Sequence, residues 1–221
     1  MTASGVFFDG VRSKIEDVHR RHSEFLDLRQ QHPWLTGCLG DPFAGIWFLA
    51  EIPSLTPVTS HGVRQSPEKQ WTGNNAALLF RRMIAKHGLK TGTELSDGGW
   101  CCYITNAIKY AAPAEVWKKK RREERLEVAR AWAPVLAWEL ETAPPRLVVA
   151  LGGRVHDILE DLIKRKLVPV PQRRERIDHY SYIARRADTS RRLAPRALGP
   201  MDPLRLADYD KQFDRIVRDG S

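Results

Sequence analysis

Three short, continuous apolar runs constrain the fold of this chain more than any other feature. They lie within 45–54 (GIWFLAEIPS), 100–109 (WCCYITNAIK) and 146–153 (RLVVALGG). A run that is apolar without alternation is expected of a strand that is covered on both faces. Segments with helical periodicity separate the runs. This alternation predicts a layered α/β domain with a largely parallel sheet.

The segment at 11–31 is the first predicted helix. Its apolar residues recur at near-helical spacing on a charged background, and they are Val11, Ile15, Val18, Phe25 and Leu28. A stripe of this kind is typical of an amphipathic helix that packs on a core. We therefore expect residues 1–40 to form an N-terminal helical extension.

Four further helices are predicted, at 74–88, 113–145, 154–166 and 202–220. Asn74 or Asn75 is the expected cap of the first of them, and Gly88 is its expected end. The second segment contains Pro134 and is interpreted as one long helix or as two helices with a break near that proline. Residues 173–186 hold a shorter strand-like piece that is followed by a basic loop.

The length and charge of the chain bound its organisation and its partners. The 221 residues predict a single domain over 1–221, with a motif-bearing core at 45–190 and a C-terminal helix at 200–221. The net charge of +9 favours a polyanionic partner such as nucleic acid. No run approaches the roughly 20 apolar residues of a membrane span, and the first residues lack the pattern of a signal peptide. We expect a cytoplasmic monomer that has no membrane partner.

The cysteines and histidines give no pattern of a metal site. The three cysteines are Cys38, Cys101 and Cys102, and no CxxC pair is present. An odd number of cysteines suits a reducing compartment better than a disulfide framework. The histidines are scattered without the spacing of metal ligands. We therefore expect no metal and no cofactor.

Polar residues follow three of the predicted strands where each strand ends. They lie at 51–54 (EIPS), 105–106 (TN) and 179–181 (HYS). The carboxyl ends of parallel strands meet at one edge of a sheet, where ligands of α/β domains bind. The sequence therefore predicts a binding site at this edge.

These strand ends, in this order, resemble the motifs of the uracil-DNA glycosylase superfamily, closest to its bacterial and archaeal Gly-Glu-Ala-Pro-Gly branch. FLAEIPS looks like that first motif, and QWTGNNAALL resembles the segment in which an aromatic residue precedes a glycine and a helix. YITNAIKYAAP is similar to the strand that ends in a base-reading asparagine. RLVVALGG and IDHYSYIARR take the places of the penultimate strand and the His-Pro-Ser motif. The resemblance covers about 45–190 and implies a three-layer sandwich with a central, mostly parallel sheet flanked by helices.

The chain also departs from the patterns of this superfamily. Ala50 and Ser54 stand in place of two glycines of the first motif, and Tyr180 replaces the proline of His-Pro-Ser. The cysteines that hold an iron–sulfur cluster in the best-known members are absent. We therefore expect this chain to do without the cluster.

The resemblance implies that the partner is DNA, double- or single-stranded, and that a base is flipped out of the helix into a pocket. Asn106 would read the edge of a pyrimidine, because an amide carries both a donor and an acceptor. Trp71 would stack on the face of the base. Ile52 would contact the flipped pyrimidine. In the best-studied branch this position holds an aspartate that accepts a proton during catalysis.

Because Ile52 has no acid–base chemistry, Glu51 is the expected catalytic carboxylate. A carboxylate can stabilise an oxocarbenium-like sugar while it orients water. His179 would donate a hydrogen bond to the pyrimidine oxygen as negative charge builds on the departing base, as a neutral or a charged imidazole. The plainer interpretations are a carboxylate after a strand and a structural histidine.

The residues expected to contact DNA are Ser54, Ser181, Tyr182, Arg185 and Arg186. The two serines would bind phosphates beside the flipped nucleotide. Tyr182, Ile183 and Arg185 would enter the duplex and fill the gap that the base leaves. The run KKKRREER at 118–125 is interpreted as a solvated helix face, with non-specific DNA contact as the alternative.

The resulting hypothesis is a monofunctional DNA glycosylase of base excision repair. It would hydrolyse the N-glycosidic bond of a damaged or modified pyrimidine, uracil by default, and leave an abasic site. The altered motifs leave open a glycosylase for modified bases of phage DNA that acts in anti-phage defence. The alternatives from other classes are a catalytically silent DNA-binding module and a hydrolase of small nucleotides.

Overall fold

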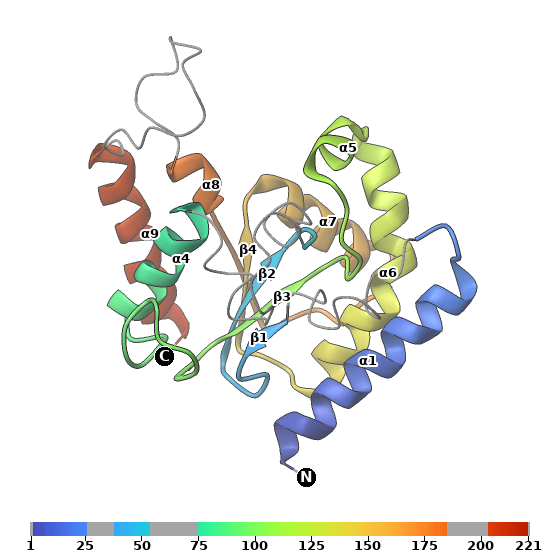
Figure 1. Cartoon of the computed structure of the whole chain (residues 1–221), viewed down its shortest axis with the longest axis horizontal. Helices are drawn as coiled ribbons and strands as arrows, with labels where there is room; N and C mark the ends of the chain where they lie inside the picture. The colour runs from blue at the N-terminus through green and yellow to red at the C-terminus, as the bar shows by residue number, and fades with distance from the viewer. Residues whose placement is uncertain (1, 26–37, 54–74, 185–202, 221) are drawn as a thin grey trace.

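A five-stranded sheet forms the centre of the computed structural model, which describes residues 2–25, 38–53, 75–184 and 203–220. The strands are β1 (Leu39–Gly40), β2 (Ile46–Ala50), β3 (Tyr103–Asn106), β4 (Leu147–Leu151) and β5 (Arg173–Ile177). Their order is β1-β3-β2-β4-β5, as Figure 1 shows in part. The neighbours among β2 to β5 are parallel, and β1 is antiparallel to β3. The predicted α/β class with a mostly parallel sheet is confirmed.

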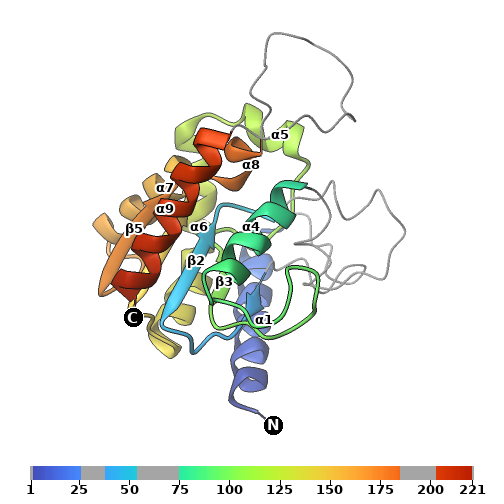
Figure 2. The same ribbon diagram turned by 90° about the vertical axis from the view of Figure 1, so that its left-hand side faces the viewer.

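Helices cover both faces of this sheet, so that the described residues form three layers (Figures 1 and 2). One layer consists of α1 (Ala3–Arg21), α5 (Ala114–Lys119), α6 (Arg122–Thr142) and α7 (Gly153–Lys164). The other layer consists of α4 (Asn75–Lys86), α8 (Tyr180–Ile183) and α9 (Pro203–Gly220). None of the helices in the described ranges combines the length and the apolar character that a membrane span requires.

The central strand β2 shows why the apolar runs in the sequence are continuous. Trp47 and Leu49 point into the core beneath α1, α6 and α7. Ile46, Phe48 and Ala50 point into the core beneath α4 and α9. Because successive side chains of a strand face opposite sides, a strand between two helical layers needs apolar residues at every position.

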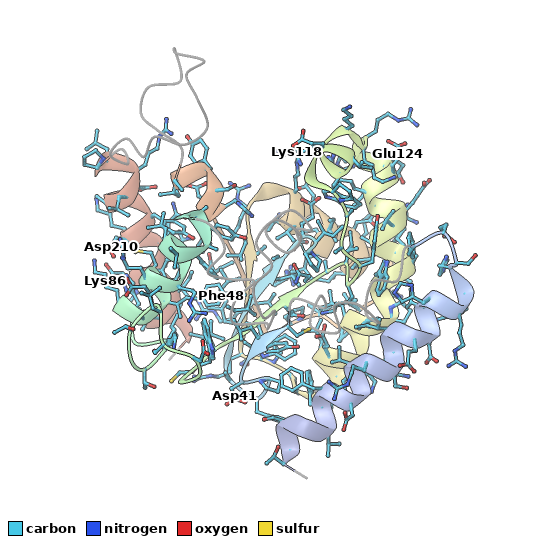
Figure 3. The ribbon with its side chains drawn as sticks, viewed as in Figure 1. Asp41, Phe48, Lys86, Lys118, Glu124 and Asp210 are labelled. Carbon is cyan, nitrogen blue, oxygen red and sulfur yellow. The ribbon has the colours of Figure 1, made fainter. Side chains whose placement is uncertain are left out.

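The second helical layer is joined by charged groups at its surface as well as by its apolar core. Nζ of Lys86 on α4 lies 2.6 Å from Oδ1 of Asp210 on α9, and the two residues lie side by side in Figure 3. Nε2 of His87 is 2.8 Å from the same oxygen. The hydrogen bond from Lys86 lowers the pKa of the Asp210 carboxyl.

The first helix is shifted toward the N-terminus relative to the predicted 11–31. It begins after Thr2, whose hydroxyl accepts from the N–H of Gly5 at 3.2 Å, and it ends at Arg21. The predicted face at Val11, Ile15 and Val18 is buried, and Phe7 extends it by one turn. Phe25 packs in the core beyond the helix end, and Leu28 lies outside the described residues.

The predicted break near Pro134 is wrong, because α6 continues through this residue. The chain breaks instead at Lys120 and Arg121, where the backbone is extended between α5 and α6. Glu124 accepts a hydrogen bond from the N–H of Arg121 at 2.5 Å, which is half of a capping box. A glutamate three residues into a helix is the signal that locates this start.

A buried ionic network lies on the α6 side of β3. Nζ of Lys109 is 2.7 Å from Oε2 of Glu139, and both side chains are 0% exposed. Tyr103 and Thr105 donate to Oε1 of Glu139 at 2.8 and 2.9 Å. The Sγ of Cys38 lies 3.7 Å from the same oxygen. Burial raises the pKa of the Cys38 thiol, and it raises that of Tyr103 well above its ordinary value.

The strand order places a topological switch at β2. From β2 the chain passes to β3 on one side, and β4 then lies on the other side of β2. In open α/β sheets the crevice at such a point, outside the carboxyl ends of the strands, is where ligands bind. The segments that follow β2, β4 and β5 meet there.

Candidate active site

A cavity of about 440 Å³ lies at the carboxyl ends of β2, β4 and β5. Its walls are the segment that follows β2, helix α5, the turn from β4 into α7 and the turn from β5 into α8. In Figure 1, α5 and α8 lie at this end of the sheet. A volume of this size is within the range of small-ligand sites.

Glu51 follows β2 directly and lines this cavity. Its side chain is 18% exposed, and its Oε1 atom is buried without a hydrogen-bond partner among the described residues. Burial raises the pKa of the carboxyl, while Trp117, Arg154 and Arg125 lower it in part. The carbonyl of Glu51 accepts from the N–H of Ile108 at 3.1 Å, so the end of β2 is fixed against the chain that leaves β3.

Two arginines and an indole surround the Glu51 carboxyl. Nε of Arg125, near the start of α6, lies 3.7 Å from Oε1 of Glu51. Arg154, at the start of α7, lines the cavity and attracts the carboxylate. Trp117 on α5 also lines the cavity and is only 4% exposed. None of the three was predicted to lie beside Glu51, because nothing in the local pattern distinguishes them from core or surface residues, and Arg125 was named only as part of the basic run at 118–125.

The basic run at 118–125 therefore has two different parts. Lys118 lines the cavity and is largely exposed, and Figure 3 shows it on α5. Arg121 and Arg122 are exposed, as the interpretation as a solvated face predicts. Arg125 is an exception, because its side chain is 14% exposed and lies beside Glu51.

His179 also lines the cavity and caps the short helix α8. Its Nδ1 accepts a hydrogen bond from the backbone N–H of Ser181 at 3.1 Å. The Oγ of Ser181 lies 2.7 Å from the same nitrogen. Because Nδ1 acts as an acceptor, this geometry requires the neutral imidazole with its hydrogen on Nε2. Of the two protonation states that the sequence left open, the structure favours the neutral ring.

Gly152 lies beside His179. It follows β4 and precedes α7 with φ +98°, and it donates its N–H to the carbonyl of Ile177 at 2.8 Å. A Cβ atom at this position would lie 3.1 Å from Cβ of His179. The position therefore requires glycine both for its backbone conformation and for the space beside the histidine.

Tyr182 and Ile183, both predicted to enter DNA, have different environments. Tyr182 lines the cavity and is 45% exposed, with the guanidinium of Arg205 of α9 at 5.0 Å from its ring centre. Ile183 is 1% exposed and packs in the core on the α4 side. The prediction for Ile183 is wrong, because a helical turn at α8 directs its side chain toward the core.

Asn106 ends β3 as predicted, in register with Ala50 of β2. It is 1% exposed and is not part of the cavity wall. The described residues therefore do not bring it into contact with the cavity that Glu51 and His179 line. Its assignment as the residue that reads the base stays a prediction.

The other predicted site residues divide into two groups. Ile52 and Ser181 line the cavity, the first half-buried and the second exposed. Those that lie outside the described residues are Ser54, Trp71, Arg185 and Arg186.

Comparison with known proteins supplies the family. The sequence profile described as "UDG: Uracil DNA glycosylase superfamily" matches residues 39–196, which is more than half of the chain. The chain belongs to the uracil DNA glycosylase superfamily. No curated protein matches it. Membership supports a DNA glycosylase, a hydrolase of base excision repair that acts on DNA, and agrees with the three-layer fold.

The three cysteines do not fit the iron–sulfur cluster of the best-known members of this superfamily. Cys38 is buried in the core on the α1 side of the sheet, and Cys102 is buried in the core on the α4 side. Cys101 is exposed. The sheet therefore separates the two buried thiols. In the described parts of the chain, no three His, Cys, Asp or Glu side chains gather as a metal site.

Proposed function

We propose that this protein is a DNA glycosylase that hydrolyses the N-glycosidic bond of a damaged or modified pyrimidine and leaves an abasic site. The observation that carries the proposal is the Glu51 carboxylate, half-buried at the topological switch of a superfamily domain and facing a cavity that His179 also lines. Uracil is the first substrate to test, because the family match points to it.

In this mechanism the flipped nucleotide enters the cavity with its sugar at Glu51. Loss of the base gives an oxocarbenium-like sugar, which the Glu51 carboxylate stabilises by its charge. The same carboxylate takes a proton from the water that attacks C1′. Arg125 and Arg154 favour the ionised form of Glu51 against the effect of burial.

His179 acts on the departing base. Its Nε2–H donates a hydrogen bond to the pyrimidine oxygen on which negative charge develops. The hydrogen bond from the Ser181 N–H to Nδ1 holds the ring in the tautomer that can donate. Lys118 and Tyr182 at the cavity rim contact the DNA on either side of the flipped nucleotide.

Labelled oligonucleotides that carry uracil, other deaminated or oxidised bases, or modified cytosines of phage type test this proposal. The protein is incubated with each, and alkali then breaks the strand at any abasic site. Cleavage at one base establishes the activity and identifies the substrate. Intact strands throughout, combined with binding that weakens steeply with salt, would instead mean that the fold recognises DNA without cutting it.

Two variants connect this activity to the site. Glu51→Gln should lower the cleavage rate by about 100-fold or more while DNA binding persists, because a neutral amide can neither stabilise the sugar nor accept a proton. Glu115→Gln is the matched control, since Glu115 is an exposed carboxylate on α5. Equal rates for Glu51→Gln and the parent would contradict the assignment of Glu51.

A further inference from the structure

Two buried polar atoms of residues that line the cavity have no hydrogen-bond partner among the described residues. They are Nε1 of Trp117 and Oε1 of Glu51. One is a donor and the other an acceptor, and both residues line the cavity. Buried polar groups are nearly always hydrogen-bonded, so an unpaired donor and an unpaired acceptor in residues that line one cavity call for an explanation.

The indole of Trp117 is held in place by its surroundings. Its backbone N–H donates to the carbonyl of Pro113 at 3.0 Å, and its ring packs edge-on against Tyr110 with ring centres 6.4 Å apart. The side chain has almost no exposed surface, so it has little freedom to move away from Glu51. The carboxyl group can turn about its last side-chain bond, because that torsion is broad.

We propose that Trp117 is a positioning residue for the catalytic carboxylate. Its indole N–H, together with the guanidinium of Arg125, holds Oε1 of Glu51, so that Oε2 is the oxygen that faces the cavity and receives the proton of the attacking water. This inference rests on the proposed function and assigns a residue to it that the motifs do not include.

Oε2 receives its proton in the hydrolysis of the glycosidic bond. The oxygen of water forms a bond to C1′ of the deoxyribose once the bond from C1′ to the base nitrogen has broken. The electron pair of that bond leaves with the base, and one proton of the water passes to Oε2 of Glu51. Trp117 takes no part in the transfer, because its N–H stays on the indole and binds Oε1 only.

The charges around Glu51 agree with this role. The cationic groups that act on it are Arg125 from α6 and Arg154 from α7, and two further titratable residues, Lys118 and His179, also line the cavity. The indole N–H of Trp117 lowers the pKa of the Glu51 carboxyl and opposes the larger effect of burial. Removing the indole N–H should therefore raise the pKa of Glu51 and release Oε1.

Trp117→Phe tests the inference, because it keeps an aromatic ring and removes only the N–H and part of the indole. Trp132→Phe is the matched control. Trp132 is 0% exposed, its Nε1 also lacks a partner among the described residues, and its ring stacks on Tyr110 at 6.1 Å. It is not part of the cavity wall.

We expect Trp117→Phe to lower kcat by about 10- to 100-fold with little change in KM, because a displaced carboxylate misplaces the water. The acid limb of the pH–rate profile should move to higher pH. Trp132→Phe should change neither. If the two variants affect kcat and the acid limb equally, Trp117 acts only in packing and the inference is wrong.

A measurement that needs no activity separates this inference from the proposed function. The pKa of Glu51 is followed by carbon-13 NMR of labelled glutamate, with the resonance assigned by its loss in Glu51→Gln. A parent that cleaves none of the oligonucleotides refutes the proposed function. A pKa of Glu51 that is the same in Trp117→Phe as in the parent refutes the positioning role.

Discussion

Replacing Glu139 by leucine should destabilise the protein by about 3–5 kcal/mol, because the change leaves the buried Lys109 ammonium without its counter-charge. The Nζ atom of Lys109 lies 2.7 Å from Oε2 of Glu139, and neither side chain is exposed. Tyr103 and Thr105 also lose the acceptor of their hydrogen bonds. The expected loss is a large fraction of the roughly 5–15 kcal/mol that stabilises a typical domain.

The double variant Lys109→Met with Glu139→Leu distinguishes a charge effect from a packing effect. It removes both charges, and apolar residues of similar volume often replace a buried ion pair at little cost. We therefore expect it to recover most of the stability that Glu139→Leu loses. Glu141→Leu is the control, because Glu141 is exposed on the same helix and should change stability by less than about 0.5 kcal/mol.

Urea unfolding followed by circular dichroism measures these free energies. A decrease of less than about 1 kcal/mol in the free energy of unfolding of Glu139→Leu would refute the reasoning, since an unpaired buried ammonium destabilises the folded state by more than that. A double variant as unstable as the single one would also refute it. If Glu139→Leu does not fold, Glu139→Gln keeps an acceptor for Tyr103 and allows the same comparison.

Two further predictions concern the site. Gly152→Ala should cost about 1–3 kcal/mol of stability and also lower activity, because the new Cβ strains the backbone and presses on His179. Gly88→Ala is its control, since φ is +73° there but no atom of the described residues lies within 4 Å of a new Cβ. A Gly152→Ala variant as active as Gly88→Ala would contradict this prediction. Burial raises the pKa of Glu51 in the folded state, so ionising it opposes folding as pH rises. Glu51→Gln should therefore unfold at higher urea than the parent at pH 7, with the difference shrinking as the pH falls toward about 4.5, the ordinary pKa of the group, and a pH-independent difference would argue against a raised pKa.

The local sequence determined the layered fold, because each apolar run has to be covered on both sides. The bounds of β2 agree with the apolar run at 46–50, and β2 pairs in parallel with β3, as a largely parallel sheet predicts. The first helix begins and ends earlier in the chain than predicted, because the prediction did not use the Thr2 cap or the position of Phe7. The two-residue strand β1 gives no pattern to detect.

The sequence motifs also predicted that polar residues at three strand ends form a site, and two of these residues, Glu51 and His179, line the same cavity, whereas Asn106 does not. Only the tertiary structure decided what surrounds these residues. Trp117, Arg125 and Arg154 come from three different helices and reach Glu51 because the helices pack around the end of β2. Local patterns specify the period and the ends of an element, whereas the neighbours of a buried carboxylate depend on how distant elements pack, and no short stretch of sequence contains that information.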